Sequence, residues 1–219
     1  MSLIKSYQIS EQFMSPQGEG VYAGAIMRFI RFAGCSVGKR VCQHCDTDFE
    51  NMHPWQGGGL FTDTHLIEQI RQSNVRHVCL TGGEPFDQPE LQSLVEKILA
   101  VPCLPMVHIE TSGTIRYPDW VSQDRIWITM SPKPGWTNVN YPDTDEFKVI
   151  VQGLGNGVGW ATLSDALMIE AETHKPVFLQ PRNAKHDINH VNLGLVEDLL
   201  RQHPQLRLSV QMHKILKVR

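Results

Sequence analysis

The sequence predicts an α/β fold, an incomplete (β/α) barrel with parallel strands and shortened or missing helices. Expected strands and helices mostly alternate along the chain, which is the pattern of a parallel sheet with crossover helices. Glycine-containing and polar motifs repeatedly follow the strands, as in folds that bind ligands at the carboxyl edge of the sheet. The strand candidates outnumber the clear helices, because segments 112–125 and 131–145 are rich in Pro, Gly and Asp.

The order of elements follows from hydrophobic patterning. Residues 1–24 are expected to be a polar lead-in ending in glycine turns, and residues 33–60 a long loop of the kind that is often functional. Thr62 or Asp63 is the expected cap of the first helix. The expected helices begin at 62 and cover 89–100, 162–173 and 191–203. The expected strands cover 25–32, 77–81, 106–111, 126–130, 146–151, 177–179 and 206–210.

Composition limits the class of protein. The 219 residues suit one α/β domain over 1–219 with a loop extension at 33–60, and 41% hydrophobic residues suffice for a core. A net charge of -3 provides no strong attraction to nucleic acid or to a membrane surface. No apolar run approaches the roughly 18 residues of a membrane span, and the N-terminus lacks a signal-peptide core. We therefore expect a cytoplasmic protein that binds neither nucleic acid nor a membrane.

Three of the five cysteines, Cys35, Cys42 and Cys45, lie in one polar segment with the spacing C-x6-C-x2-C. Thiolates are preferred ligands of zinc, copper(I) and iron–sulfur centres, and two sulfurs separated by two residues can hold one centre. Three cysteines leave a site open, whereas structural zinc normally has four protein ligands. A zinc site closed by His44 or by a distant histidine is the alternative. Two cysteines in apolar or proline-flanked surroundings are interpreted as packing residues, Cys79 and Cys103.

The segment Thr81-Gly82-Gly83-Glu84-Pro85 follows an apolar run. Two glycines at a strand end allow a ligand to approach the backbone, and Glu84 can accept hydrogen bonds from an ammonium group. Alone, the segment is an ordinary glycine turn. Together with the cysteine triplet it resembles the radical S-adenosylmethionine superfamily, in which three cysteines hold a 4Fe-4S cluster and Gly-Gly-Glu-Pro binds the methionine amino group.

Further motifs extend over nearly the whole chain. They are Pro16-Gln17-Gly18-Glu19-Gly20, Arg28 and Arg31 on the first strand, Cys45-Asp46-Thr47, Ser131-Pro132-Lys133, Gln180-Pro181 and Gln211-Met212-His213-Lys214. In this order, they resemble the 7-carboxy-7-deazaguanine synthase family. The first cysteine spacer is three residues longer than the superfamily's usual C-x3-C-x2-C, and Lys39 and Arg40 lie within it.

The resemblance implies three cofactors, a 4Fe-4S cluster, S-adenosyl-L-methionine and Mg²⁺. The cysteine triplet would hold the cluster with one iron open to S-adenosylmethionine. Thr47 matches the magnesium position, and Mg²⁺ accepts one or two protein oxygens plus water and substrate. A simple loop hydroxyl is the alternative for Thr47. The implied S-adenosylmethionine contacts are His44, Gly83, Glu84, Ser131, Pro132, Lys133, Gln180, Pro181, Arg182 and Asn183.

The implied reaction converts 6-carboxy-5,6,7,8-tetrahydropterin into 7-carboxy-7-deazaguanine with loss of ammonia, a carbon–nitrogen lyase reaction of queuosine biosynthesis. The cofactor carries the radical, so no catalytic side chain is implied. Arg31 suits a substrate carboxylate, while Arg28 points to the other face of the strand. Gln211, His213 and Lys214 fit a substrate site and a solvated C-terminal strand equally well. The implied substrate contacts are Pro16, Gln17, Gly18, Arg31 and Thr81.

The resemblance also implies an external one-electron donor such as flavodoxin, and a homodimer. Two other functions share some of these motifs. A glycyl-radical enzyme activase has the cluster and Gly-Gly-Glu-Pro but acts on a protein, and the 17–20 loop and the short chain weigh against it. A non-catalytic zinc or iron–sulfur interaction module would make the segment 82–85 coincidental.

Overall fold

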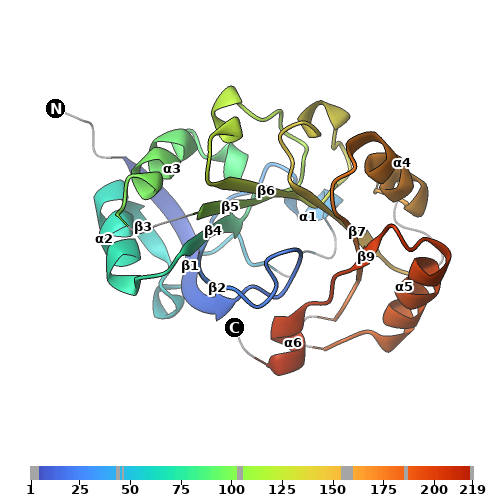
Figure 1. Cartoon of the computed structure of the whole chain (residues 1–219). Coiled ribbons are helices and arrows are strands. Elements are labelled where there is room, and N and C mark those ends of the chain that lie inside the picture. Colours follow the sequence, from blue (N-terminus) through green and yellow to red (C-terminus); the bar gives the residue numbers. More distant parts are fainter. Residues whose placement is uncertain are drawn as a thin grey trace.

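The structure is a computed structural model that describes residues 5–42, 45, 47–102, 106–153, 160–184 and 187–217. In this part of the chain, nine strands form one curved sheet in the order β3-β1-β2-β4-β5-β6-β7-β8-β9 (Figure 1). In the order of the sheet, each strand from β2 through β4 to β9 is parallel to its neighbour. β1 is antiparallel to both of its neighbours, β2 and β3. Among the described strands, β3 and β9 are the two edges of the sheet and do not pair with each other, which confirms the incomplete barrel. The strands are β1 (Ser6–Pro16), β2 (Ile26–Phe32), β3 (Gly59–Thr62), β4 (His77–Gly82), β5 (Met106–Thr111), β6 (Ile126–Met130), β7 (Glu146–Val151), β8 (Val177–Pro181) and β9 (Arg207–Leu208).

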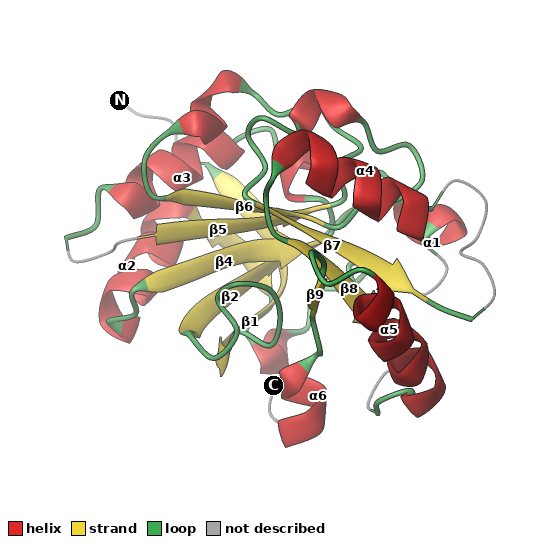
Figure 2. Cartoon of the chain, turned by 45° about the vertical axis from the view of Figure 1, so that its right-hand side comes forward, coloured by secondary structure: helices red, strands yellow, loops and turns green. Residues whose placement is uncertain are grey.

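The longer helices surround the outside of the curved sheet (Figure 2). Short 3-10 turns, Asp119–Ser122 and Asn138–Asn140, replace crossover helices after β5 and β6, as the compositions of 112–125 and 131–145 predict. In the described residues, no helix is long and apolar enough to cross a membrane. The helices are α1 (Gly38–Val41), α2 (Asp63–Ser73), α3 (Leu91–Leu99), α4 (Leu163–Thr173), α5 (His190–Gln202) and α6 (Met212–Leu216).

The helix ends follow capping chemistry. Thr62 caps α2, because its side chain accepts a hydrogen bond from the backbone N–H of His65 at 3.2 Å. The helix expected from residue 89 begins at Leu91, after Glu90 at the N-cap. A capping box at Thr162 and Asp165 starts α4, which explains why its start was predictable from sequence.

The main core lies between the sheet and the helices. In α3, four apolar residues at helical spacing are almost fully buried, and each contributes roughly 1.5–3 kcal/mol of transfer free energy. On β4, Val78 and Leu80 join this core, while Cys79 packs with a second cluster inside the barrel. The strand is therefore buried on both faces, as is typical of parallel sheets. The predicted packing role of Cys79 is confirmed, and Cys103 lies outside the described residues.

The expectation of a polar lead-in over 1–24 is wrong, because β1 occupies 11 of these residues. Its hydrophobic alternation is hidden by a register shift between Ile9 and Glu11 and by two buried polar side chains, Ser10 and Gln12. A bulge of this kind moves the following residues to the other face. Polar residues on the inward face of β1 make it unrecognisable as a strand in the sequence.

The ends of two other segments also differ from expectation. The loop expected over 33–60 contains α1 and the first residues of β3, and β3 pairs with β1 at the edge of the sheet. The strand expected over 206–210 is reduced to Arg207 and Leu208, because only these residues pair with β8. After it, α6 replaces the solvated strand that was the alternative for the C-terminal motif.

A histidine pair lies at the amino end of the barrel. His77 Nδ1 and His108 Nε2 are 2.9 Å apart, and the ring of Tyr22 packs edge-on against His108 and Trp127. Burial, and to a smaller extent His77, lowers the pKa of His108 from 6.5 to about 3. The structure therefore holds this imidazole neutral across the physiological range.

We expect this histidine to make the fold acid-sensitive. In the unfolded chain His108 gains a proton as pH falls through about 6.5, but the folded chain excludes that proton until pH reaches about 3. Stability is thus lost as pH falls, by about 2 kcal/mol at pH 5. Urea unfolding at pH 7.5 and pH 5 should give a smaller loss for His108→Phe than for the wild type. His190→Gln, at an exposed histidine, is the control. An equal loss in all three proteins would contradict the assignment.

Candidate active site

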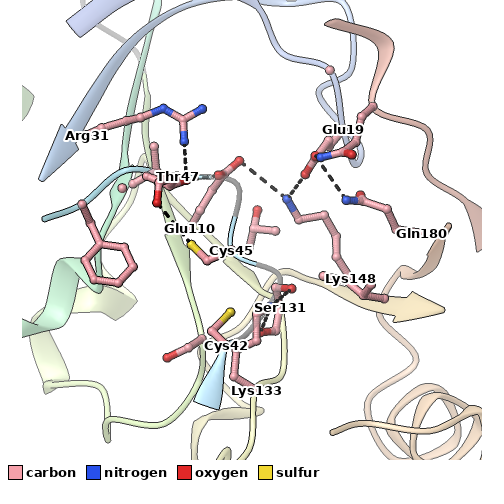
Figure 3. A pocket seen from close by; sticks show the side chains of 18 of the residues that line it. Glu19, Arg31, Cys42, Cys45, Thr47, Glu110, Ser131, Lys133, Lys148 and Gln180 are labelled. Carbon is pink, nitrogen blue, oxygen red and sulfur yellow. Dashed lines mark hydrogen bonds and ion pairs between the residues drawn. The ribbon is translucent and has the colours of Figure 1, made fainter. Parts of the chain in front are cut away.

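A cavity of about 680 Å³ lies at the carboxyl ends of the parallel strands. Figure 3 shows that it brings together sulfur-bearing residues and a buried charged group. Of the predicted site residues, Pro132 does not line it, and His44 lies outside the described residues. The predicted residues that line it are Pro16, Gln17, Gly18, Arg31, Cys35, Cys42, Cys45, Thr47, Thr81, Gly83, Glu84, Ser131, Lys133, Gln180, Pro181, Arg182 and Asn183.

The three cysteines Cys35, Cys42 and Cys45 are partly buried on one wall of this cavity. The Cys45 backbone N–H donates to the Cys42 carbonyl at 3.0 Å. A hydrogen bond with Cys45, followed by burial, raises the pKa of the Cys42 thiol, and burial raises the pKa of Cys35. Among the described residues, no three Cys, His, Asp or Glu side chains are already gathered as for a metal ion. The three thiols nevertheless line one cavity, and cysteine thiolates are the usual ligands of iron–sulfur clusters.

The long spacer between the first two cysteines contains α1. Lys39 in this helix pairs with Glu50 at 2.7 Å and lies 5.6 Å from the centre of the Phe49 ring. Lys39 lines the cavity, and its neighbour Arg40 is exposed. The extra residues thus form one helical turn at the rim of the cavity.

Gly82 and Gly83 allow the turn after β4 to lie against the cysteine segment. Gly82 has φ +104°, a conformation that other residues rarely adopt. A Cβ atom on Gly83 would lie 1.5 Å from the carbonyl oxygen of Gly34, directly before Cys35. The Gly83 backbone N–H also donates to Phe32 at 2.9 Å. The glycine pair is therefore required for packing between two backbones, in addition to its predicted ligand contact.

Glu84 is 2% exposed, and its carboxylate is engaged by the protein. It accepts hydrogen bonds from Thr111 Oγ1 at 2.8 Å, from the Ser112 backbone N–H at 2.9 Å and from the Phe86 backbone N–H at 3.2 Å. Burial raises the pKa of Glu84. These contacts join the turn after β4 to the end of β5, and a contact with S-adenosylmethionine stays a prediction.

Lys133 extends into the cavity after β6. Its Nζ donates to Ser131 Oγ at 2.6 Å and to the Ser131 carbonyl at 3.0 Å, and lies 5.4 Å from the Trp160 ring centre. Burial lowers the pKa of Lys133. The Ser131-Pro132-Lys133 segment thus presents a hydroxyl and an ammonium group to the cavity.

Arg31 and Thr47 meet beside Cys45 (Figure 3), whose thiol donates to the Thr47 carbonyl at 3.6 Å. Arg31 Nη1 donates to Thr47 Oγ1 at 2.9 Å, and Arg31 Nε lies 3.1 Å from Glu11 Oε1. The residue predicted to bind a carboxylate is therefore in contact with the residue predicted to bind magnesium. Arg28 instead bonds Gln12 and Gln69, and does not line the cavity.

Sequence reasoning included Glu19 in the 16–20 motif, but it did not identify Glu110 and Lys148 as site residues or predict that the three buried charges meet. The Lys148 side chain is 6% exposed, forms an ion pair with Glu19, and lies 3.7 Å from Glu110. In Figure 3 it extends between the two carboxylates. Two signals were available, because Lys148 interrupts the apolar strand Glu146–Val151 and Glu110 ends an apolar strand directly before Thr111.

Side-chain amides and a hydroxyl complete this charged group. Glu110 accepts from Gln17 at 3.1 Å and from Thr81 at 3.0 Å, which places two predicted substrate residues on one carboxylate. Burial opposes ionisation of Glu110, but the positive charges of Lys148 and Arg31 outweigh it and lower its pKa. Glu19 accepts from Gln180 at 3.2 Å and Gln211 at 2.9 Å.

The C-terminal motif belongs to the site. Gln211 is buried, and the Met212 backbone N–H donates to the Gly18 carbonyl at 3.0 Å. A Cβ atom on Gly18 would lie 2.3 Å from His213 Nδ1, so Gly18 allows this imidazole to pack against the loop. Gln211, His213 and Lys214 all line the cavity.

We expect Gly83→Ala to displace the cysteine segment while leaving the sheet intact. The added methyl group overlaps the Gly34 backbone, and overpacking of this kind costs about 1–3 kcal/mol. After anaerobic reconstitution, the variant should bind less iron per chain than the wild type at an unchanged circular dichroism spectrum. Gly194→Ala, with nothing near its Cβ position in α5, is the matched control. Full iron binding in Gly83→Ala would show that the segment is not held by this contact.

We compared the chain with known proteins in three ways. The scan against protein-family models found no match. The curated 7-carboxy-7-deazaguanine synthase of Synechocystis sp. is 38% identical over 222 residues, covering 99% of this chain and 96% of the relative. That of Bacteroides thetaiotaomicron is 33% identical over 215 residues, covering 97% and 98%.

The fold has a counterpart among solved structures. The crystal structure of QueE from Escherichia coli superimposes with a TM-score of 0.66 at 23% identity, and 94% of each chain is covered. This likeness supports the mostly parallel, unclosed sheet. The nearly full-length identity to the curated relatives shows the family, and the chain belongs to the 7-carboxy-7-deazaguanine synthase family.

Proposed function

We propose that this protein converts 6-carboxy-5,6,7,8-tetrahydropterin into 7-carboxy-7-deazaguanine, with loss of ammonia, by radical S-adenosylmethionine chemistry. One observation carries the proposal. The three cysteines line the same cavity as Arg31 and the buried charged group. The residues proposed for the metal cluster and those proposed for a carboxylated heterocycle thus line one cavity.

The cysteine wall is the part that fits the metal cofactor. Cys35, Cys42 and Cys45 would hold the 4Fe-4S cluster, and Gly83, the Ser131–Lys133 segment and the end of β8 would contact S-adenosylmethionine. When bound, the cluster and S-adenosylmethionine supply the one-electron cleavage that starts hydrogen abstraction from the substrate. The chain's own part is to hold both groups beside the substrate and to keep competing reactants out.

The part of the cavity wall around Arg31 suits the substrate. A guanidinium fork binds a carboxylate with two parallel hydrogen bonds, and Arg31 lines the cavity beside Thr47. Mg²⁺ at Thr47 would join the substrate to this wall, because Mg²⁺ takes few protein oxygens and shares its remaining positions with water and ligand. Gln17, Thr81 and Glu110 provide donors and acceptors for the heterocycle.

Two features support the synthase over a protein-activating enzyme. A volume of about 680 Å³ is within the usual range of roughly 300–1,000 Å³ for small-molecule sites. Family membership points the same way. We propose further that the protein forms a homodimer and receives its electron from an external one-electron donor such as flavodoxin.

Anaerobic turnover tests the proposed function. Reconstituted protein, given S-adenosylmethionine, Mg²⁺, a reductant and the carboxytetrahydropterin, should form the deazaguanine in an amount that exceeds the enzyme. Cys42→Ala should lose both iron and activity, because it removes one of three thiol ligands. Cys79→Ala should keep its iron, because Cys79 packs inside the barrel with Met27 and Phe29.

The outcomes separate the candidate functions. Iron binding without any deazaguanine would reject the synthase reaction for this chain. Stoichiometric zinc and no iron–sulfur spectrum would instead favour the interaction module. Full iron and activity in Cys42→Ala would overturn the ligand set.

Arg31→Lys should weaken substrate binding more than cofactor binding. An ammonium group cannot reproduce the two parallel hydrogen bonds of a guanidinium, and losing one charge-assisted bond costs roughly 1.5–3 kcal/mol, or about one to two decades in affinity. Reductive cleavage of S-adenosylmethionine without substrate should stay nearly unchanged.

The measurements are the substrate dissociation constant and the uncoupled cleavage rate. Arg28→Lys is the matched control, because Arg28 lies on the same strand and outside the cavity lining. Equal dissociation constants for Arg31→Lys and wild type would assign the substrate carboxylate to another residue.

A further inference from the structure

Lys148 is a buried cation inside the proposed substrate site. It extends from β7 into the cavity and interacts with Glu19 from the turn after β1 and with Glu110 from β5. The three residues come from segments more than 30 residues apart in the chain, and they meet only in the folded barrel. With both acids ionised and the lysine protonated, the three side chains carry a net formal charge of -1.

The geometry leaves part of Glu110 available to a ligand. An ionised carboxylate has about four acceptor positions. In the described part of the chain, Gln17 donates to Oε1 and Thr81 donates to Oε2, and the residue lines the cavity. N–H groups of a bound heterocycle are donors of the kind that such a carboxylate accepts.

Two neighbouring, largely buried carboxylates stay ionised together only with a compensating cation, because like charges and burial both favour protonation. Arg31 faces Glu110 as well, but it is paired with Glu11 at 3.1 Å. Lys148 is in reach of both Glu19 and Glu110. It therefore has the position needed to balance the two acids.

We propose that Lys148 is a positioning residue, which keeps the carboxylates of Glu19 and Glu110 charged and oriented as acceptors for N–H groups of the bound heterocycle. This inference rests on the proposed function. Lys148 acts through the two acids, which would make the contacts with the ligand. Its own ammonium group is occupied by them, so its loss should change binding through their protonation.

The charged and titratable groups around Lys148 agree with this role. Burial would lower the pKa of Lys148, but the neighbouring carboxylates raise it above its usual value. The pKa of Glu19 is lowered, because the charge of Lys148 outweighs the effect of burial. The groups that interact electrostatically with Lys148 or with these two acids are Glu146 on β7, Lys133 after β6, Arg31 on β2 and Cys79 on β4.

The test measures binding of 6-carboxypterin, a fluorescent oxidised relative of the proposed substrate, between pH 6 and pH 9. Wild type, Lys148→Gln, Lys148→Met and Lys148→Arg are compared, so that a neutral variant remains if one of the two does not fold. Lys5→Met is the matched control, because Lys5 forms its ion pair with Glu90 away from the cavity. Turnover of the carboxytetrahydropterin is measured with the same proteins.

In the neutral variants, 6-carboxypterin should bind about tenfold or more weakly at pH 7, the effect of one lost charge-assisted hydrogen bond. Binding should strengthen as pH rises, because the acids lose a proton that Lys148 no longer excludes. Wild type, Lys148→Arg and Lys5→Met should show no such rise over this range. A merely structural role would weaken binding equally at every pH.

Three results would each overturn a statement. Wild-type turnover together with unchanged, pH-independent binding by Lys148→Gln or Lys148→Met rejects the role of Lys148 and leaves the proposed function standing. A wild type that neither binds 6-carboxypterin nor forms the deazaguanine rejects the proposed function itself. Weaker binding without a pH dependence assigns Lys148 to structure alone, against the proposal.

Discussion

The ion pairs of Lys148 are the interaction on which the rest of the site depends. A charge buried in the barrel is stable only when it is paired and hydrogen-bonded, and removing one partner of such a pair typically costs about 3–5 kcal/mol. Lys148 meets this requirement by joining β7 to the turn after β1 and to β5. Gln180 and Gln211 extend the group to β8 and the C-terminal segment. An open sheet whose described ends do not pair is thus connected across its interior by polar contacts.

A second constraint acts at the rim, where two loops lie closer than side chains would allow. The missing side chain of Gly83 admits the Gly34 carbonyl directly before Cys35. Glu84 then connects the same turn to Thr111 and Ser112 through hydrogen bonds. The position of the cysteine segment therefore depends on backbone packing at β4 as well as on any metal that it binds. This explains why glycine and glutamate occur side by side at this strand end.

The cavity combines two chemical surfaces that suit different partners. One group of lining residues contains three thiols and the ammonium group of Lys133, and a second, polar group contains Arg31, Thr47 and the acids around Lys148. The two groups meet where Cys45 contacts Thr47. Under the proposed function, the first group would hold the metal cofactor and the second the heterocycle. Both lie at the carboxyl edge of one parallel sheet and line one cavity.

The sequence by itself determined the elements whose signals are local. The bounds of β5, β6 and β7 follow from short apolar runs, and the start of α4 follows from its capping box. The cysteine spacing and the glycine motif likewise identified the family, which the comparisons show. Each of these features depends on residues that are neighbours in the chain.

Only the tertiary structure decided which polar residues meet. β1 was unrecognisable because its inward face is polar, and a polar inward face is favourable only where other strands supply hydrogen-bond partners. Glu110 and Lys148 are ordinary charged residues in sequence, and they join Glu19 of the 16–20 motif in one site because three distant segments converge inside the barrel. The same applies to the contact of Gly18 with His213. Long-range electrostatics and close packing depend on distances in space, and local sequence patterns do not contain these distances.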